Sequence, residues 1–285
     1  MQDQEMPTLS ETLANINLTQ PKLNYQPSVQ AKESTYIPAV IITLLNDGPS
    51  TYGTRKLLNS IRDTGSKLLP LVLNASTPET MRVDLIPILG PELAPKIQWT
   101  WPIDSKQDGM DLQTNLYRRA YASANWKRVM ACMVSHMRAW HTSIQMNSPI
   151  VVLEHDAIFV KTFKYRYMTD QGFSNGVIGL NLPLGATRKA KIFHTRVNEN
   201  KGTGVFPVPI IDDPKLDPPL PSGLAGNSAY VITPSAAKQL IDKTRQIGLW
   251  PNDALMCQQL FPWLYVSRPY YTELQNMKST TTQMN

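Results

Sequence analysis

The sequence predicts an α/β domain in which helices flank a mostly parallel β-sheet. The first reason is a strand, a helix and a second strand in succession over residues 37–75, since two consecutive parallel strands need such a crossover. The second is a β-branched apolar run at 151–159 that is interrupted by charged residues. The third is a strand over 225–233 that leads directly into a helix start, with Thr233 as N-cap and Pro234 at the first helical position.

The remaining elements follow from local spacing and from turn residues. Prolines break the segment 76–111, whose structure stays ambiguous, and residues 170–222 are rich in loops. The predicted strands and turn before the central run lie at 37–45 (strand), 46–50 (turn) and 68–75 (strand). The predicted helices lie at 54–62, 112–124, 126–146, 235–245 and 251–256. The later short strands are expected at 176–180, 191–195 and 265–271, and a proline-stiffened acidic loop at 212–219.

The chain divides into three parts by composition. Residues 1–36 are polar and weakly periodic, which indicates a tail or docking arm. Residues 37–272 hold all the strong patterns and are expected to form a single catalytic domain. Residues 273–285 are rich in Ser, Thr and Gln and are expected to be frayed.

Composition bounds the class of protein. A hydrophobic content of 42% supports a sizeable core, and no run of eighteen apolar residues predicts a membrane span. The start of the sequence lacks a basic and an apolar region, and there are only two cysteines, so we expect a cytoplasmic protein without disulfides. The net charge of +6 favours an anionic partner such as a sugar nucleotide, a membrane surface or nucleic acid, without choosing among them.

The central apolar run carries Glu154, His155 and Asp156 in three successive positions. Charged side chains are costly inside a strand, whereas ligands of open α/β sheets bind at carboxyl ends of strands. Two carboxylates on one side of an extended chain suit Mg²⁺ or Mn²⁺. The alternative is a strand end with solvated acids, which this segment alone favours.

The helix 126–146 carries an apolar stripe that includes His136 and Trp140. We therefore expect His136 to be a core histidine that is hydrogen-bonded to the backbone. Cys132 lies four residues before it, but two residues alone are a weak indication of zinc.

Three segments, in this order, resemble glycosyltransferase family 25, which includes lipooligosaccharide and collagen galactosyltransferases. Residues 131–140 (ACMVSHMRAW) are similar to the family's Gly-Cys-x-x-Ser-His-x-x-x-Trp helix. Residues 152–157 (VLEHDA) are similar to its Leu-Glu-Asp-Asp-Ala. Residues 229–237 (AYVITPSAA) are similar to its Tyr-x-Ile-Ser-x-x-Gly-Ala, with Pro251-x-Asp253 following.

The resemblance implies a GT-A-like (Rossmann-like) fold and the transfer of a hexose, with inversion, from a nucleotide sugar that is usually UDP-linked. It also implies a divalent metal held by Glu154, His155 and Asp156, with Asp156 as the direct ligand. The chain departs from the family at His155, which stands where the family has an acid and would favour Mn²⁺ over Mg²⁺. It departs again at 43–48, where the family's Asn-Leu-Asp-Arg-Arg run is absent.

Further roles follow from the same resemblance. Asp253 is the predicted base that takes the proton of the acceptor hydroxyl, and Asp156 also contributes to catalysis through the metal. Candidate binding residues for the nucleotide sugar and acceptor are Arg55, Thr43, Ser135, Asn227 and Ser228. The acceptor is expected to be a glycan or lipopolysaccharide, and the oligomeric state stays open.

Three other interpretations remain at this point. The same chemistry could act on a hydroxylated DNA base, because the chain is basic. The fold could bind a sugar nucleotide or a partner without turnover, because His155 alters the site. A metal-dependent phosphohydrolase or nucleotidyltransferase ranks last, because the extra Asp and His clusters expected of one are missing.

Overall fold

The computed structural model describes residues 36–121, 125–184, 190–200, 202–211 and 220–277. Three predicted features lie wholly or mostly outside these residues, namely nearly all of the N-terminal arm, the acidic loop at 212–219 and residues 278–285 of the C-terminal tail. Within the described part, no helix has both the length and the hydropathy needed to cross a bilayer.

The domain begins with the predicted strand, helix and strand. β1 (Ile37–Thr43) and β2 (Leu68–Asn74) are parallel neighbours, connected by α2 (Gly48–Asp63). The helix starts earlier than predicted because Asp47 caps it: its carboxylate accepts a hydrogen bond of 2.8 Å from the backbone N–H of Ser50. The segment expected to be a turn is therefore partly helical.

The central sheet has seven strands, five of which run in the same direction. The two strands that run the other way are β9, inside the sheet, and β8, at one edge, so the predicted mostly parallel sheet is confirmed. Their order across the sheet is β2, β1, β5 (Ile150–Glu154), β9 (Ala229–Ile232), β7 (Val177–Gly179), β10 (Leu264–Arg268) and β8 (Gly204–Pro207).

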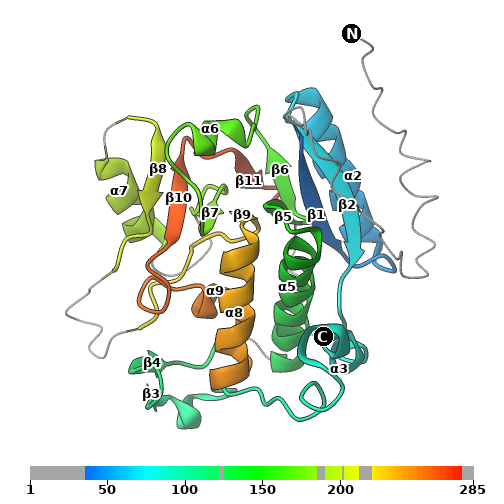
Figure 1. The fold of residues 1–285 in the computed structure, drawn as a ribbon, viewed down its shortest axis with the longest axis vertical. Coiled ribbons are helices and arrows are strands. Elements are labelled where there is room, and N and C mark those ends of the chain that lie inside the picture. The colour runs from blue at the N-terminus through cyan, green and yellow to red at the C-terminus, as the bar shows by residue number, and fades with distance from the viewer. Residues whose placement is uncertain (1–35, 122–124, 185–189, 201, 212–219, 278–285) are drawn as a thin grey trace. The chain divides into compact units, whose positions relative to one another are not determined.

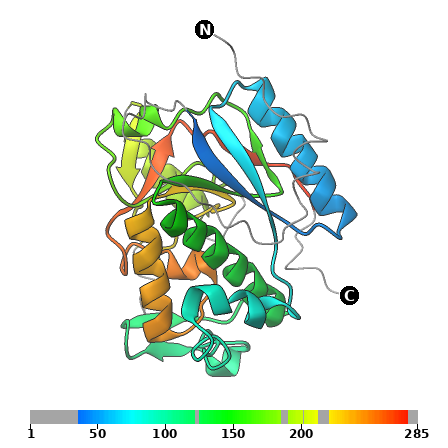
Figure 2. The same ribbon diagram turned by 45° about the vertical axis from the view of Figure 1, so that its right-hand side comes forward.

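Both faces of this sheet are covered, as the residues of β5 show. Ile150 and Val152 point into one core with α5 (Trp126–Met146) and α8 (Pro234–Ile247), which lie side by side (Figure 1). Val151 and Leu153 point into a second core with α2, on the opposite face (Figure 2). Successive side chains of a strand alternate between faces, so a strand buried on both sides needs the continuous apolar run seen in the sequence.

A two-stranded ribbon adds to the α2 side of the sheet. It pairs β6 (Ala157–Phe159) with β11 (Thr272–Leu274). The amide nitrogen of the next residue, Gln275, lies 2.8–3.1 Å from the carbonyl oxygens of Gly53, His155 and Ala157, which share its two N–H donors. Ordered structure therefore continues past residue 272, where the sequence suggested that fraying begins.

The predicted helix over 112–124 is wrong. Part of that range forms β4 (Leu116–Arg118), which pairs with β3 (Gly109–Asp111) in a small hairpin. Asn115 in the connecting turn has a φ of +55°, a left-handed conformation that asparagine tolerates and that ends helical geometry. Asp111 also accepts hydrogen bonds from the N–H and the hydroxyl of Thr114, which fixes the turn.

The predicted strand over 191–195 is also wrong, because this segment belongs to α7 (Ala190–Glu199). Phe193 and Val197 are both buried. Their four-residue separation is the helical period, whereas a strand would have placed them on one face together with exposed Thr195.

The prolines of 76–111 limit that segment to single turns of helix, as their number suggested. The remaining short helices are α3 (Met81–Asp84), α4 (Ile86–Leu89), η1 (Ser105–Gln107), α6 (Arg166–Thr169) and α9 (Asn252–Leu255). The predicted caps of α8 are confirmed, since Thr233 precedes the helix, Pro234 begins it and Gly248 follows it with a φ of +88°.

Candidate functional site

The acidic segment of the sequence lies where β5 ends. The strand stops at Glu154, the chain turns through His155 and Asp156, and a second strand, β6, begins at Ala157. The N–H of His155 donates to Ile42 O at 3.1 Å. The predicted position at the carboxyl end of the central strand is correct, and the turn brings the acidic side chains to the edge of the sheet.

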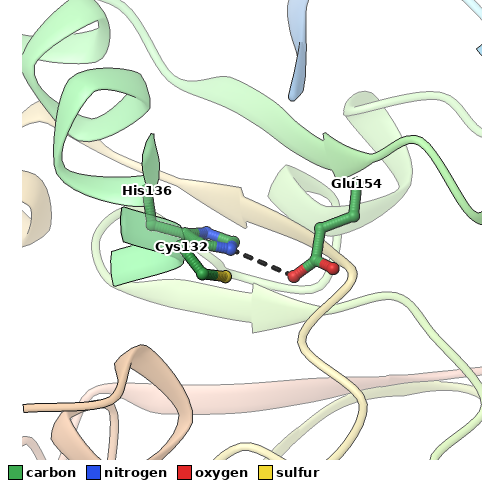
Figure 3. Close-up of side chains that lie close together, drawn as sticks. All are labelled: Cys132, His136 and Glu154. Atoms are coloured by element: carbon green, nitrogen blue, oxygen red, sulfur yellow. Dashed lines mark hydrogen bonds and ion pairs between the residues drawn. The ribbon is translucent and has the colours of Figure 1, made fainter. Parts of the chain in front are cut away.

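A buried chain of hydrogen bonds connects α5 and β9 to Glu154. Trp140 Nε1 donates to the Tyr230 hydroxyl at 2.7 Å, and the hydroxyl lies 2.8 Å from His136 Nδ1. His136 Nε2 lies 3.0 Å from Glu154 Oε1, the contact drawn as a dashed line in Figure 3. Trp140, Tyr230 and His136 are fully buried. His136 is therefore a core histidine, as expected, but its partners are a tyrosine and a carboxylate rather than the backbone.

The carboxylate at the end of this chain assigns the histidine tautomer. The carboxylate of Glu154 can only accept, so His136 Nε2 carries a ring proton and donates to it. Nδ1 of the neutral ring then accepts the O–H of Tyr230, whose oxygen accepts from Trp140. Glu154 is thus held in one orientation at the strand end by three residues that lie in the two family-like segments 131–140 and 229–237.

Cys132 lies one helical turn before His136 and faces the same carboxylate. Its sulfur, a ring nitrogen of His136 and an oxygen of Glu154 lie within 4.8 Å of one another. Burial and then the charge of Glu154 raise the pKa of the Cys132 thiol well above its usual range, so the thiol is protonated at neutral pH. His136 and Glu154 are bonded to each other at 3.0 Å, and the Cys132 side chain packs beside them. We therefore interpret these three residues as a packed group in which His136 orients Glu154.

That group differs from the predicted ligand set of Glu154, His155 and Asp156. Among the described residues, His155 and Asp156 do not join Glu154 in any such close group of three ligand atoms. Burial lowers the pKa of His155, and the charges of Glu154 and Asp47 act against this shift. Its ring is therefore neutral at pH 7 and brings no positive charge to the strand end.

Asp156 is the least satisfied of the acids. Its Oδ1 atom is buried and has no hydrogen-bond partner among the described residues. Burial, together with the charge of Glu154, raises its pKa from 3.8 to about 7. A buried carboxylate with an empty oxygen and a like charge nearby is the arrangement that a cation would relieve.

Asp253 completes the cluster from the other side. It lies in α9, which packs on α5, and accepts a 2.6 Å hydrogen bond from the hydroxyl of Tyr121. Burial raises its pKa, and the charge of Glu154 contributes in the same direction. The structure thus brings the predicted base into electrostatic reach of Glu154, although the two residues are far apart in the sequence.

Two glycines let the backbone approach these acids closely. A Cβ atom at Gly53 would lie 2.7 Å from the carbonyl oxygen of His155, and one at Gly223 would overlap the carbonyl oxygen of Asp253. Any larger residue would displace one of the two site segments. Neither role could be predicted from the sequence, because both contacts join segments that are distant along the chain.

The predicted binding residues divide into three groups. Asn227 and Ser228 lie beside the site: the backbone oxygen of Ser228 accepts from Glu154 N at 2.7 Å, and the Asn227 Nδ2 and Ser228 Oγ atoms are buried with no partner among the described residues. Thr43 and Ser135 are buried and already bonded, Thr43 to Thr54 Oγ1 at 2.7 Å and Ser135 to the N–H of Ser76 at 2.8 Å. Their hydroxyls therefore hold neighbouring segments in place.

Arg55 forms the third group, because the structure does not bring it to the acids. It is exposed on α2 and its guanidinium lies over the ring of Tyr52, 5.8 Å from the centroid. Gly53, which meets His155, lies about 200° around the helix from it. The structure instead adds residues that the sequence did not single out, above all Tyr121, which lies in the wrongly predicted helix, and Tyr230, which lay in a family-like segment without an assigned role.

The model of glycosyltransferase family 25, described as an LPS biosynthesis protein family, matches residues 103–256, which is more than half of the chain. A structure of mouse xyloside xylosyltransferase 1 in its apo form resembles 80% of this chain and 83% of that one, with 12% identity and a TM-score of 0.35. No curated protein matched the sequence. The matched residues contain the helix, the acidic turn and the Tyr230 strand described above, and on this match the chain belongs to glycosyltransferase family 25.

Proposed function

We propose that this chain transfers a hexose from a UDP-sugar to an acceptor hydroxyl, with a divalent cation and with inversion at the sugar carbon. The observation that carries this proposal is the convergence of Glu154, Asp156 and Asp253 at the carboxyl edge of the sheet. Burial, together with the charge of Glu154, raises the pKa of both Asp156 and Asp253 there, and such perturbation is concentrated at functional sites. Membership of a glycosyltransferase family supports the general reaction.

The residues fit a divalent cation. Asp156 offers a buried oxygen without a partner, and Glu154 offers the oxygens of a carboxylate that His136 orients. We assign these two side chains as ligands, with Mn²⁺ favoured because the neutral ring of His155 lies between them in sequence. When bound, the cation would neutralise charge on the leaving diphosphate.

Asp253 is the proposed base. The acceptor hydroxyl loses its proton to the Asp253 carboxylate while its oxygen forms a bond to the anomeric carbon. The bond from that carbon to the phosphate oxygen breaks on the opposite face, and its electron pair leaves with the nucleoside diphosphate. A raised pKa makes Asp253 a better proton acceptor than a solvated aspartate, and Tyr121 holds its carboxylate in place.

The first test is calorimetric titration of UDP into the wild-type chain, with and without Mn²⁺. We expect Mn²⁺-dependent binding that weakens at least tenfold in Asp156→Ala. Asp63→Ala is the matched control, because Asp63 is an exposed acid on α2 whose side chain pairs only with neighbouring Arg62 among the described residues. Equal binding by wild type and Asp156→Ala would refute the cation assignment. Absence of UDP binding would refute the donor, and other nucleotide sugars would then be titrated.

A second test concerns the reaction itself. Incubation with UDP-hexoses and a panel of glycans, followed by NMR of the product's anomeric proton, gives both transfer and stereochemistry. An inverted product supports the proposal, and a retained one contradicts the single-displacement mechanism. UDP binding without transfer or donor hydrolysis would indicate a binding protein instead, and sugar found only on DNA would move the acceptor to a modified base.

A further inference from the structure

The close group of Cys132, His136 and Glu154 brings together three different ligand atoms for a metal. The sulfur of Cys132, a ring nitrogen of His136 and a carboxylate oxygen of Glu154 lie within 4.8 Å of one another (Figure 3). The first two residues are one turn apart on α5, and the third is the last residue of β5. The sequence alone showed only the helical pair, and the fold supplies the third group.

These three atom types form a ligand set that suits zinc. Thiolate sulfur, imidazole nitrogen and carboxylate oxygen bind Zn²⁺ at about 2.3, 2.0–2.1 and 2.0–2.2 Å, and sites with three protein ligands keep a fourth position open. Tetrahedral bonds of these lengths place the ligand atoms about 3.3–3.6 Å apart. The distances from the sulfur to the other two atoms therefore need to shorten by no more than about 1.5 Å, which small rotations of the Cys132 and Glu154 side chains supply.

The group is accessible from solvent on one side and rigid on the other. The side chain of Glu154 is 26% exposed and Cys132 is partly exposed, whereas the side chain of His136 is fully buried. The Tyr230 hydroxyl lies 2.8 Å from His136 Nδ1, so Nε2 is the nitrogen directed at the carboxylate. A metal-binding histidine is usually fixed in this way through its other ring nitrogen.

Negative charge around the group favours a cation. After burial, the charges of Glu154, Asp253 and Asp156 raise the pKa of the Cys132 thiol. The thiol is therefore protonated in the metal-free chain, but a bound cation reverses this balance and holds the thiolate. On binding, the thiol proton is released to solvent and the ring proton of His136 moves from Nε2 to Nδ1, where the Tyr230 oxygen accepts it.

We propose that Cys132, His136 and Glu154 form a binding site for a thiophilic divalent cation such as Zn²⁺, with water in the fourth position. Without this cation, the three residues form the packed group described above. The site differs chemically from the proposed Mn²⁺ site, because thiolate ligands select softer metals whereas carboxylates suit Mn²⁺.

The two sites share Glu154, which gives the proposal a consequence. Zn²⁺ held by Cys132 and His136 occupies the Glu154 carboxylate, so this carboxylate is no longer available to a cation at Asp156. Zn²⁺ should therefore weaken Mn²⁺-dependent binding of UDP. This consequence, unlike the site itself, rests on the proposed function.

The site is tested with Co²⁺, which binds at zinc sites and gives a near-ultraviolet charge-transfer band when a thiolate coordinates it. The full wild-type chain is titrated beside Cys132→Ser and Cys257→Ser. Cys257 is the matched control, because the chain has only two cysteines and this one is fully buried in the core. We expect the band in wild type and Cys257→Ser, its loss in Cys132→Ser, and its disappearance when one equivalent of Zn²⁺ displaces Co²⁺. Circular dichroism melts verify that each variant is folded.

The outcomes separate this site from the proposed function. Absence of the band from wild type, or its survival in Cys132→Ser, would refute the site even where UDP binds with Mn²⁺. A band that depends on Cys132, without any binding of UDP, would support the site and refute only the donor.

A competition titration tests the shared carboxylate. Where UDP binds, we expect equimolar Zn²⁺ to weaken Mn²⁺-dependent UDP binding at least tenfold in wild type and less than twofold in Cys132→Ser. Equal weakening in both would place the competing Zn²⁺ between Glu154 and Asp156, without the thiolate, and would overturn the inference that Zn²⁺ acts from the Cys132 site.

Discussion

Replacing Asp156 by asparagine should raise the stability of the metal-free protein, and increasingly so as the pH rises. The carboxyl group has a buried oxygen without a partner among the described residues, and burial and the charge of Glu154 raise its pKa from 3.8 to about 7. A folded-state pKa above the unfolded value means that the protonated form is favoured by folding. The contribution of protonated Asp156 to the free energy of unfolding is complete below pH 3.8 and is lost as the pH rises through 7.

The magnitude follows from the same pKa. Between pH 5 and pH 7 the folded protein keeps a proton that the unfolded chain has already lost, and each pH unit corresponds to 1.36 kcal/mol. Wild type should thus lose at most about 3 kcal/mol of unfolding free energy relative to Asp156→Asn over this range. For a domain of roughly this size, 1 kcal/mol shifts the melting temperature by about 2–4 °C, so the difference in Tm should grow by up to about 6–12 °C.

The assay is thermal unfolding followed by circular dichroism in EDTA, at intervals from pH 5 to pH 8. Asp170→Asn serves as control, because the side chain of Asp170 is 56% exposed and pairs with Arg166 across one turn. A difference between wild type and Asp156→Asn that stays constant with pH would refute the reasoning. Addition of Mn²⁺ should then stabilise wild type but not Asp156→Asn, which tests the proposed cation without any measurement of activity.

Three further predictions concern the surroundings of the acids. Tyr230→Phe removes the hydroxyl that satisfies His136 and a buried indole, so urea denaturation should show a loss of about 2–4 kcal/mol, and an unchanged midpoint would contradict the hydrogen-bond chain. In Gly223→Ala the added methyl group would overlap the carbonyl oxygen of Asp253 and push α9 away. Turnover should fall at least tenfold while thermal unfolding remains cooperative, and full activity would show that this close approach is unnecessary. Arg55→Ala should bind UDP with an affinity within twofold of wild type by calorimetry, because the Arg55 side chain is exposed away from the acids. A larger loss would show that Arg55 contributes to donor binding.

The central strands were predictable because a buried strand has a distinctive composition. Residues 150–154 are apolar on both sides of the chain up to Glu154, and each side faces a separate core. Local chemistry also identified the start of α8, since the Thr233 cap and Pro234 act within one turn. In these cases the determining interactions lie within a few residues, or require only that both faces be apolar.

The two wrong elements have different causes. Residues 112–124 have helical spacing, but the capping of a turn by Asp111 and the left-handed Asn115 outweighs it. Residues 191–195 have few apolar positions, so a short window could not separate period two from period 3.6. The burial of Phe193 and Val197 at helical spacing favours the helix, and this burial depends on the residues that pack against them.

The same limit applied to the candidate site. The two acids of the strand end could be found from sequence, because they interrupt an apolar run within three positions. Their partners could not, since Tyr230 is 94 residues from His136 and Tyr121 is 132 residues from Asp253. The fold brings these residues together, so the sequence shows which residues are present but not which of them pair.

The departure of His155 from the family pattern is best understood through what that position does. Its main chain closes the sheet, because its N–H donates to Ile42 and its carbonyl accepts from Gln275, and any residue supplies these groups. Its side chain is neutral at pH 7, because burial lowers its pKa, so the exchange of acid for imidazole removes one negative charge without adding a positive one. Glu154 has no such freedom: its carboxylate is the end of a buried hydrogen-bond chain, and a change there would leave the ring N–H of His136 unpaired. The site therefore accommodates a change at residue 155, because the structural role of this position depends on its backbone. The proposed cation would still have its two carboxylate ligands, Glu154 and Asp156.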